Sequence, residues 1–178
     1  MEKRIIATSR ECQARLVPTG DPITIPSNTF VTLTQNLGGT YTVIMNGNMA
    51  RVDSADADAL GFEPQILEFE PPANGEVDME QVKTALATVY DPEIPVNVVD
   101  LGLICDIRRV DGAVEVDVTF TSTACPAVTI IKEDIQRRLL AESDVATVHV
   151  EETWEVNWTS ARISGCGREE MKRYGITL

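Results

Sequence analysis

One cysteine–proline pair separates a strand-like segment from a helix-like segment in the second half of this 178-residue chain. Residues 114–120 alternate apolar and polar side chains, as a half-buried strand does, whereas residues 127–141 repeat apolar positions with a helical period. Pro126 suits the first turn of that helix, because its missing N–H group is not needed there. We therefore expect Cys125 at or next to the helix N-cap, where unpaired N–H groups and the helix dipole favour a thiolate. The alternative is a small buried cysteine that fits a tight turn.

A second constrained stretch, DPEIPVNVVDLGLI, runs from Asp91 to Ile104. Its two prolines end the preceding helical pattern and favour extended backbone at the residue before each of them. Three carboxylates, Asp91, Glu93 and Asp100, therefore surround a rigid turn that leads into a strand. Neighbouring carboxylates raise each other's proton affinity and can bind cations, which predicts a functional loop. Turn-forming aspartates and a solvated acidic face are the structural alternative.

The pattern after residue 77 predicts an α+β domain. The expected order is helix, strand, strand, helix, strand, helix (α-β-β-α-β-α), which gives a three-stranded mixed sheet packed with helices. Capping residues and turn signals mark where most elements begin or end. The expected elements are a helix capped by Asp78, strands 101–110 and 114–120 joined by Asp111-Gly112, helix 127–141, strand 145–150, and a short helix from Ser164 to Tyr174 that Gly175 terminates.

Residues 1–70 predict a smaller unit that precedes this domain. Residues 1–20 show no clear periodicity, so we expect an irregular arm or a short helix there. Short β-rich runs follow between residues 23 and 52, and Asn46-Gly47 favours a two-residue hairpin turn, which indicates a small antiparallel β unit. The stretch 68–76 breaks all periodicity and is typical of a linker. Domains are therefore expected at residues 1–70 and 77–178.

The composition limits the classes of binding partner and the cellular compartment that we expect for this chain. The formal net charge of −13 argues against nucleic acid and anionic membranes as partners. No stretch approaches the ~18 apolar residues of a membrane span, and the first residues lack a signal-peptide core, so a cytoplasmic location is expected. In a reducing cytosol, free thiols are expected for Cys12, Cys105, Cys125 and Cys166. Cys105 falls on the apolar face of a predicted strand, which favours core packing.

The run DPEIPVNVVDLGLI, followed after a hairpin by TFTSTACPA and a helix, resembles the iron–sulfur assembly domain of SufT, PaaD and the eukaryotic cytosolic iron–sulfur targeting proteins. The resemblance covers residues 78 to about 176, and the run TLTQNLGGTYTVIMNGNMARVDSADADALG resembles the N-terminal extension of SufT-type proteins. It implies a non-enzymatic role in iron–sulfur cluster maturation, with Asp91, Glu93, Thr121 and Cys125 as the characteristic residues. A labile, transiently bound iron–sulfur cluster is the implied cofactor, and assembly proteins and client apoproteins are the implied partners.

The expected site centres on Cys125 as thiolate and metal ligand, with Asp100 and Thr123 completing the surrounding loop and pocket. One cysteine cannot fill the four-thiolate set of an iron–sulfur cluster. The missing ligands would come from a second subunit of a homodimer, a partner, a small thiol, or Cys166. A cysteine-dependent thiol transferase or hydrolase is the alternative, and it needs His149, the only histidine, as its base. A non-catalytic adaptor of the PaaD kind is a third interpretation.

Overall fold

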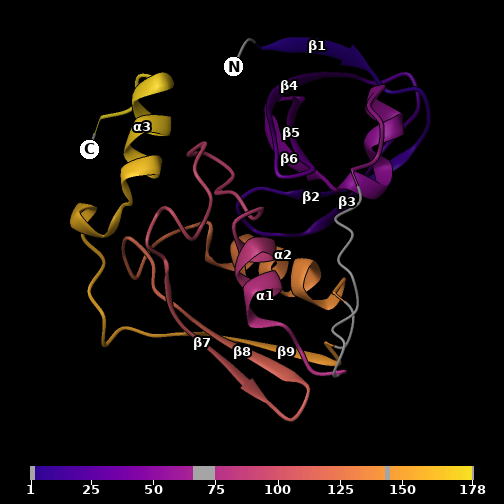
Figure 1. Ribbon diagram of the computed structural model, residues 1–178. Helices are drawn as coiled ribbons and strands as arrows, with labels where there is room; N and C mark the ends of the chain where they lie inside the picture. The colour runs from indigo at the N-terminus through magenta and orange to yellow at the C-terminus, as the bar shows by residue number, and fades with distance from the viewer. Residues whose placement is uncertain (1–2, 66–74, 143–144, 178) are drawn as a thin grey trace. The chain divides into compact units, whose positions relative to one another are not determined.

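The computed structural model describes residues 3–65, 75–142 and 145–177, and the chain divides into two compact units, residues 1–66 and 67–178 (Figure 1). The predicted linker at residues 68–76 falls largely outside these described ranges. The first unit is built on an antiparallel sheet, and the second combines a three-stranded mixed sheet with helices. The predicted α+β class is confirmed.

The first unit is a six-stranded sheet with the order β1-β4-β5-β6-β2-β3. Alternate side chains of its strands point into one apolar core, which includes Ile25, Val43 and Val52, each fully buried. Both residues of the Asn46-Gly47 turn have positive φ, as a type I′ hairpin requires. The elements are β1 Arg4–Ala7, β2 Cys12–Leu16, β3 Pro22–Ile25, β4 Phe30–Leu37, β5 Thr40–Met45, β6 Asn48–Val52 and the 3₁₀ helix η1 Ser54–Leu60.

The prediction of an irregular arm or short helix within residues 1–20 is wrong, because this segment contains β1 and β2. β1 pairs with β4, and β2 pairs with both β3 and β6. These strands have only four and five residues, which is too short for a clear period in the sequence. Their hydrogen-bond partners are supplied by strands elsewhere in the chain, so only the assembled sheet specifies them.

The second unit follows the order α1, β7, β8, α2, β9, η2, α3. β7 and β8 form an antiparallel hairpin through Asp111 and Gly112, whereas β9 runs parallel to β8 after the crossover through α2. The sheet order is β7-β8-β9. The bounds are α1 Met79–Leu86, β7 Ile104–Val110, β8 Ala113–Val118, α2 Val128–Leu140, β9 Thr147–Glu152, η2 Ser160–Arg162 and α3 Gly165–Arg173.

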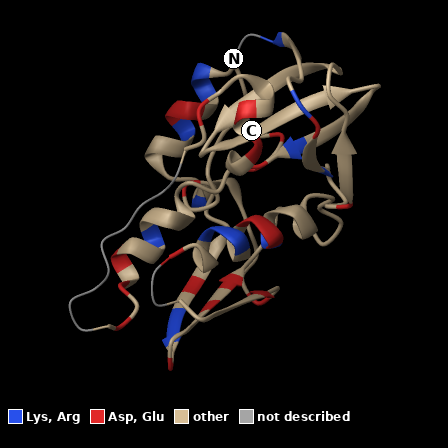
Figure 2. Cartoon of the chain, turned by 90° about the vertical axis from the view of Figure 1, so that its right-hand side faces the viewer, with Lys and Arg blue, Asp and Glu red and all other residues tan. Residues whose placement is uncertain are grey.

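Helices α1 and α2 cover one face of this sheet (Figure 1). The face beneath them is apolar: Val114, Val116 and Val118 of β8 are fully buried, and so are the inward-facing isoleucines of α2. The opposite face is charged, and acidic and basic residues mark its strands in Figure 2. There Arg108 donates hydrogen bonds to Asp117 and forms ion pairs with it and with two other carboxylates. Within the described ranges, no helix is long and apolar enough to cross a bilayer.

Local signals placed the last helix correctly. Ser164 is the N-cap of α3, and its side chain accepts a hydrogen bond from the Gly167 N–H group. Gly175 has a φ of 71° just beyond the end of the helix. β7, in contrast, begins at Ile104 rather than at residue 101. Residues 97–103 form a turn instead, in which the Leu101 N–H group donates to the Asn97 carbonyl group.

Candidate functional site

Two loops at one end of the three-stranded sheet form a pocket of about 170 Å³ around Cys125. Residues 91–103 lead into β7, and residues 119–127 connect β8 to α2. β7 begins and β8 ends at this edge of the sheet because the two strands are antiparallel. The polar lining of the pocket consists of Asp91, Glu93, Thr121, Ser122 and Cys125. The structure therefore brings together four of the residues that the sequence singled out.

The carboxylate of Asp91 stabilises the first loop. Its Oδ1 atom accepts hydrogen bonds from the N–H groups of Glu93 and Ile94, both at 2.8 Å. This arrangement is an Asx turn, in which the side chain takes the place of a backbone carbonyl group. Asp91 is only 8% exposed, whereas Glu93 is exposed at the rim of the pocket. The two acidic residues thus differ in role: Asp91 shapes the wall, and Glu93 presents its charge to solvent.

Asp100 is not among the residues that line the pocket, although the sequence grouped it with Asp91 and Glu93. Its carboxylate accepts hydrogen bonds from the Asn97 amide group, at 2.7 Å, and from the Ser164 hydroxyl group. Asp100 therefore joins the turn before β7 to the start of α3. Thr123 is exposed and also lies outside the residues that line the pocket.

Cys125 is half-buried, and its position relative to α2 differs from the prediction. The N-cap of α2 is Ala127, so Cys125 lies two residues before the cap rather than at or next to it. The Cys125 N–H group donates to the Ser122 carbonyl group at 3.1 Å, and this turn precedes a further turn through Pro126. The helix starts only when the Ile131 N–H group can reach the Ala127 carbonyl group, at 3.0 Å.

The other cysteines have different surroundings. Burial raises the pKa of the Cys12 and Cys105 thiols, which keeps both in the protonated form. Cys166 is exposed in α3 and does not line the Cys125 pocket. Among the residues that the structure describes, no group of three or more His, Cys, Asp or Glu side chains is placed to hold a metal ion.

The geometry gives no support to a Cys125–His149 dyad. His149 lies in β9 opposite Glu115 and is exposed, whereas its neighbours Val148 and Val150 are buried on the face that packs against α2. Since successive side chains of a strand point to opposite faces, His149 lies on the charged face of the sheet. The Cys125 pocket, in contrast, is floored by Ile131 of α2.

The sequence did not reveal the apolar floor of the pocket. Leu101, Leu103, Phe120 and Ile131 line it, and each is at most 2% exposed. In the sequence these residues are indistinguishable from ordinary core positions. The ring of Phe120 lies 6.4 Å from that of Trp154, which is 42% exposed. An exposed aromatic side chain therefore stands beside a residue of the pocket.

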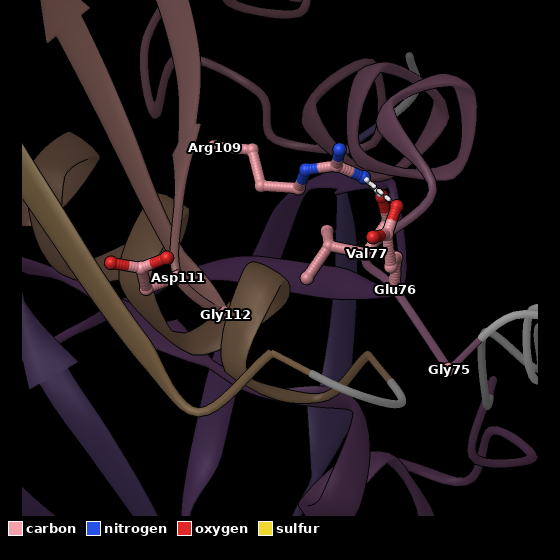
Figure 3. A pocket seen from close by; sticks show the side chains of 6 residues that line it. All are labelled: Gly75, Glu76, Val77, Arg109, Asp111 and Gly112. Atoms are coloured by element: carbon pink, nitrogen blue, oxygen red, sulfur yellow. Dashed lines mark hydrogen bonds and ion pairs between the residues drawn. The ribbon is translucent and has the colours of Figure 1, made fainter.

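A second pocket, of about 320 Å³, lies beside the β7–β8 hairpin (Figure 3). Its Arg109 guanidinium forms an ion pair with Glu76 at 3.1 Å and donates to the Val77 carbonyl group. Asp111 points away from this pair in Figure 3. This pocket is larger, but it contains no thiol, and its arginine is already paired with a carboxylate. The Cys125 pocket is therefore the better candidate site.

Comparison with known proteins concerns the second unit, which contains both pockets. Residues 79–150 match the model of a family described as iron–sulfur cluster assembly protein. A Porphyromonas gingivalis protein named Fe-S protein maturation auxiliary factor is 42% identical over 86 residues, which cover 48% of this chain and 82% of the relative. The chain belongs to this family. The Staphylococcus aureus Fe-S protein maturation auxiliary factor SufT is 31% identical over 77 residues, 43% of this chain and 88% of its own length.

Family membership confirms the resemblance to SufT-type proteins. The family model matches a range within the second unit and includes both Asp91 and Cys125, whereas the first unit lies outside the matched residues. Among solved structures, a conserved hypothetical protein from Thermotoga maritima is 34% identical and covers 57% of this chain and 98% of its own, with a TM-score of 0.49.

Proposed function

We propose that this protein is a non-enzymatic maturation factor that assists the delivery of iron–sulfur clusters to apoproteins, with Cys125 as a thiolate ligand. The observation that carries the proposal is the pocket, in which Cys125 lies with Asp91, Glu93 and Thr121 over an apolar floor. Membership of the iron–sulfur assembly family gives the class of process. Relatives are named auxiliary factors, and His149 is not placed to serve Cys125 as a base.

In this proposal the cluster is a cargo that the protein passes on and not a cofactor that it keeps, because the pocket contains a single cysteine. An iron–sulfur cluster is normally held by four cysteine thiolates, so the remaining iron positions need ligands from elsewhere. A second copy of the chain, an assembly partner or a small thiol would supply them. Delivery then requires only ligand exchange: a client thiolate takes the coordination position on iron that the Cys125 sulfur leaves, without electron transfer. A cluster held in this way is labile and readily transferred.

The carboxylates of the pocket have separate tasks in this proposal. Asp91 keeps the loop in shape through its bonds to two backbone N–H groups. Glu93, exposed at the rim, contacts the assembly partner or client. Thr121, also exposed at the rim, lies in the same loop as Cys125 and contributes to the opening through which that contact is made.

The experiment is anaerobic reconstitution with ferrous iron and sulfide, followed by visible absorption and size-exclusion chromatography. The wild-type protein should carry fewer than one cluster per chain and shift towards a dimer as the cluster loads. Cys125→Ser should abolish both effects, whereas Cys105→Ser, at a half-buried thiol outside the pocket, is the matched control and should change neither.

Cys166→Ser tests the remaining thiol of the second unit. Loss of half or more of the bound iron would make Cys166 a second ligand, contributed across the interface between two chains. A tight, stoichiometric cluster on a monomer that lacks Cys125 would contradict the proposal.

A further inference from the structure

Residues 153–164, the C-terminal strap, cross the end of the sheet at which the Cys125 pocket lies. The strap begins where β9 ends, and its first contacts are with the chain that leaves β8. The Thr153 N–H group donates to the Val118 carbonyl group at 2.9 Å, and the Thr119 hydroxyl group donates to the Val156 carbonyl group at 2.9 Å. The Phe120 ring packs beside Trp154. The strap is thus attached to the loop that carries Cys125.

The second half of the strap is attached to the other loop of the pocket. The Trp158 indole N–H group donates to the Leu101 carbonyl group at 2.8 Å, and Arg162 Nε donates to the Gly102 carbonyl group at 2.8 Å. The two segments approach so closely that a Cβ atom at residue 102 would lie 2.5 Å from the Arg162 carbonyl oxygen. Glycine is therefore required at this position for the strap to lie where it does.

Helix α3 fixes the far end of the strap. The Ser164 N–H group donates to the Asp100 carbonyl group at 2.9 Å, and the Ser164 hydroxyl group donates to the Asp100 carboxylate. Arg168 of α3 donates to the carbonyl groups of Ser160 and Ile163 within the strap. Asp100, which the sequence assigned to the pocket, is therefore an attachment point of the strap.

Leu101 and Phe120, which both line the pocket, connect these contacts to Cys125. Trp158 of the strap binds the backbone of Leu101. On the other loop, Thr119 binds the backbone of the strap, and Phe120 packs beside Trp154 of the strap. We propose that the C-terminal strap is a positioning element that sets the spacing of the two pocket loops and hence the exposure of Cys125. Trp158 is its principal positioning residue. This role deepens the proposed function of the Cys125 pocket and lies in a segment beyond the residues matched by the family model.

Alkylation kinetics test the proposal without iron or a client. The full-length protein is treated with iodoacetamide, and mass spectrometry of its peptides gives separate rates for Cys125 and for Cys166, an exposed thiol of the same unit that serves as the reference. Trp158→Phe keeps an aromatic side chain but removes the N–H donor, and Thr119→Val removes the hydroxyl group through which the Cys125 loop binds the first half of the strap. Each should raise the Cys125 rate by about threefold to tenfold, the range for loss of one hydrogen bond, and should leave the Cys166 rate unchanged.

Two matched variants complete the test. Thr119→Ser retains the hydroxyl group and should restore the wild-type Cys125 rate, whereas Arg173→Met removes an exposed ion pair within α3 and should change nothing. Unchanged Cys125 rates in both Trp158→Phe and Thr119→Val would overturn the proposal. A rise of the Cys125 rate in Arg173→Met as large as that in the strap variants would also overturn it, because the rate would then not depend on the contacts of the strap. If the alkylation rates change as expected but the wild-type protein binds no cluster, the proposed function is wrong, whereas the positioning role of the strap is still supported.

Discussion

Glu142 is a buried carboxyl group whose protonation should control the stability of the second unit. It lies just beyond α2, where its N–H group donates to the Leu139 carbonyl group at 3.1 Å, and it is only 7% exposed. Its Oε1 atom accepts no hydrogen bond from any residue that the structure describes. Burial, followed by the charge of Asp78 at the N-cap of α1, raises the pKa of Glu142 from 4.5 to about 7.

The sign of the resulting pH dependence follows from proton binding. A carboxyl group with a higher pKa in the folded protein binds more protons when folded than when unfolded. The free energy of unfolding therefore falls as the pH rises from 4.5 to about 7, and the penalty is complete above that range. The difference between these two pKa values of Glu142 corresponds to about 3 kcal/mol at most.

Glu142→Gln keeps the shape of the side chain and removes its ionisation. Urea unfolding at pH 5 and pH 8 can be followed by tryptophan fluorescence, since Trp154 and Trp158, the only two tryptophans, both lie in the second unit. Between these pH values, the wild-type protein should lose about 2 to 3 kcal/mol more stability than Glu142→Gln. Glu151→Gln, at an exposed position of β9, is the control and should follow the wild type. Parallel profiles for wild type and Glu142→Gln would refute the reasoning.

Gly102→Ala should lower the free energy of unfolding by about 2 kcal/mol or more, because residue 102 has a φ of +71° and the added Cβ would meet Arg162; an unchanged Tm would contradict this. Asp91→Ala should cost about 1 to 2 kcal/mol, since two backbone N–H groups lose their acceptor. Asp91→Asn retains an acceptor oxygen and should lower the free energy of unfolding by less than about 1 kcal/mol. Equal losses for Asp91→Ala and Asp91→Asn in urea unfolding would show that the charge of Asp91, rather than its acceptor oxygen, stabilises the loop. A chain that begins at Gly75 should remain soluble and keep the wild-type alkylation rate of Cys125, whereas aggregation would mean that the two units share a core.

Short-range signals in the sequence were sufficient for much of the fold. Asn46-Gly47 and Asp111-Gly112 each form a hairpin turn with two positive φ angles, as their residue types predicted. Asp78 and Ser164 cap the helices that they were expected to cap. These features depend on the conformational preferences and hydrogen bonds of a few neighbouring residues, so a single sequence contains the necessary information. The pairing of DPEIP with the Cys125 loop was accessible only through the resemblance to a family.

Tertiary structure decided what local signals could not. Asp91 and Asp100 are both aspartates of the same loop, but they have different roles. Asp91 binds backbone N–H groups of the loop and lies in the pocket wall. Asp100 instead binds Ser164, which lies far along the chain. β1 and β2 form only because distant strands supply their hydrogen-bond partners. Trp158 contacts the pocket loop only because β9 delivers the strap to the end of the sheet where β7 begins. Each of these contacts joins residues that are far apart in the chain, and only the folded backbone brings their donors and acceptors together.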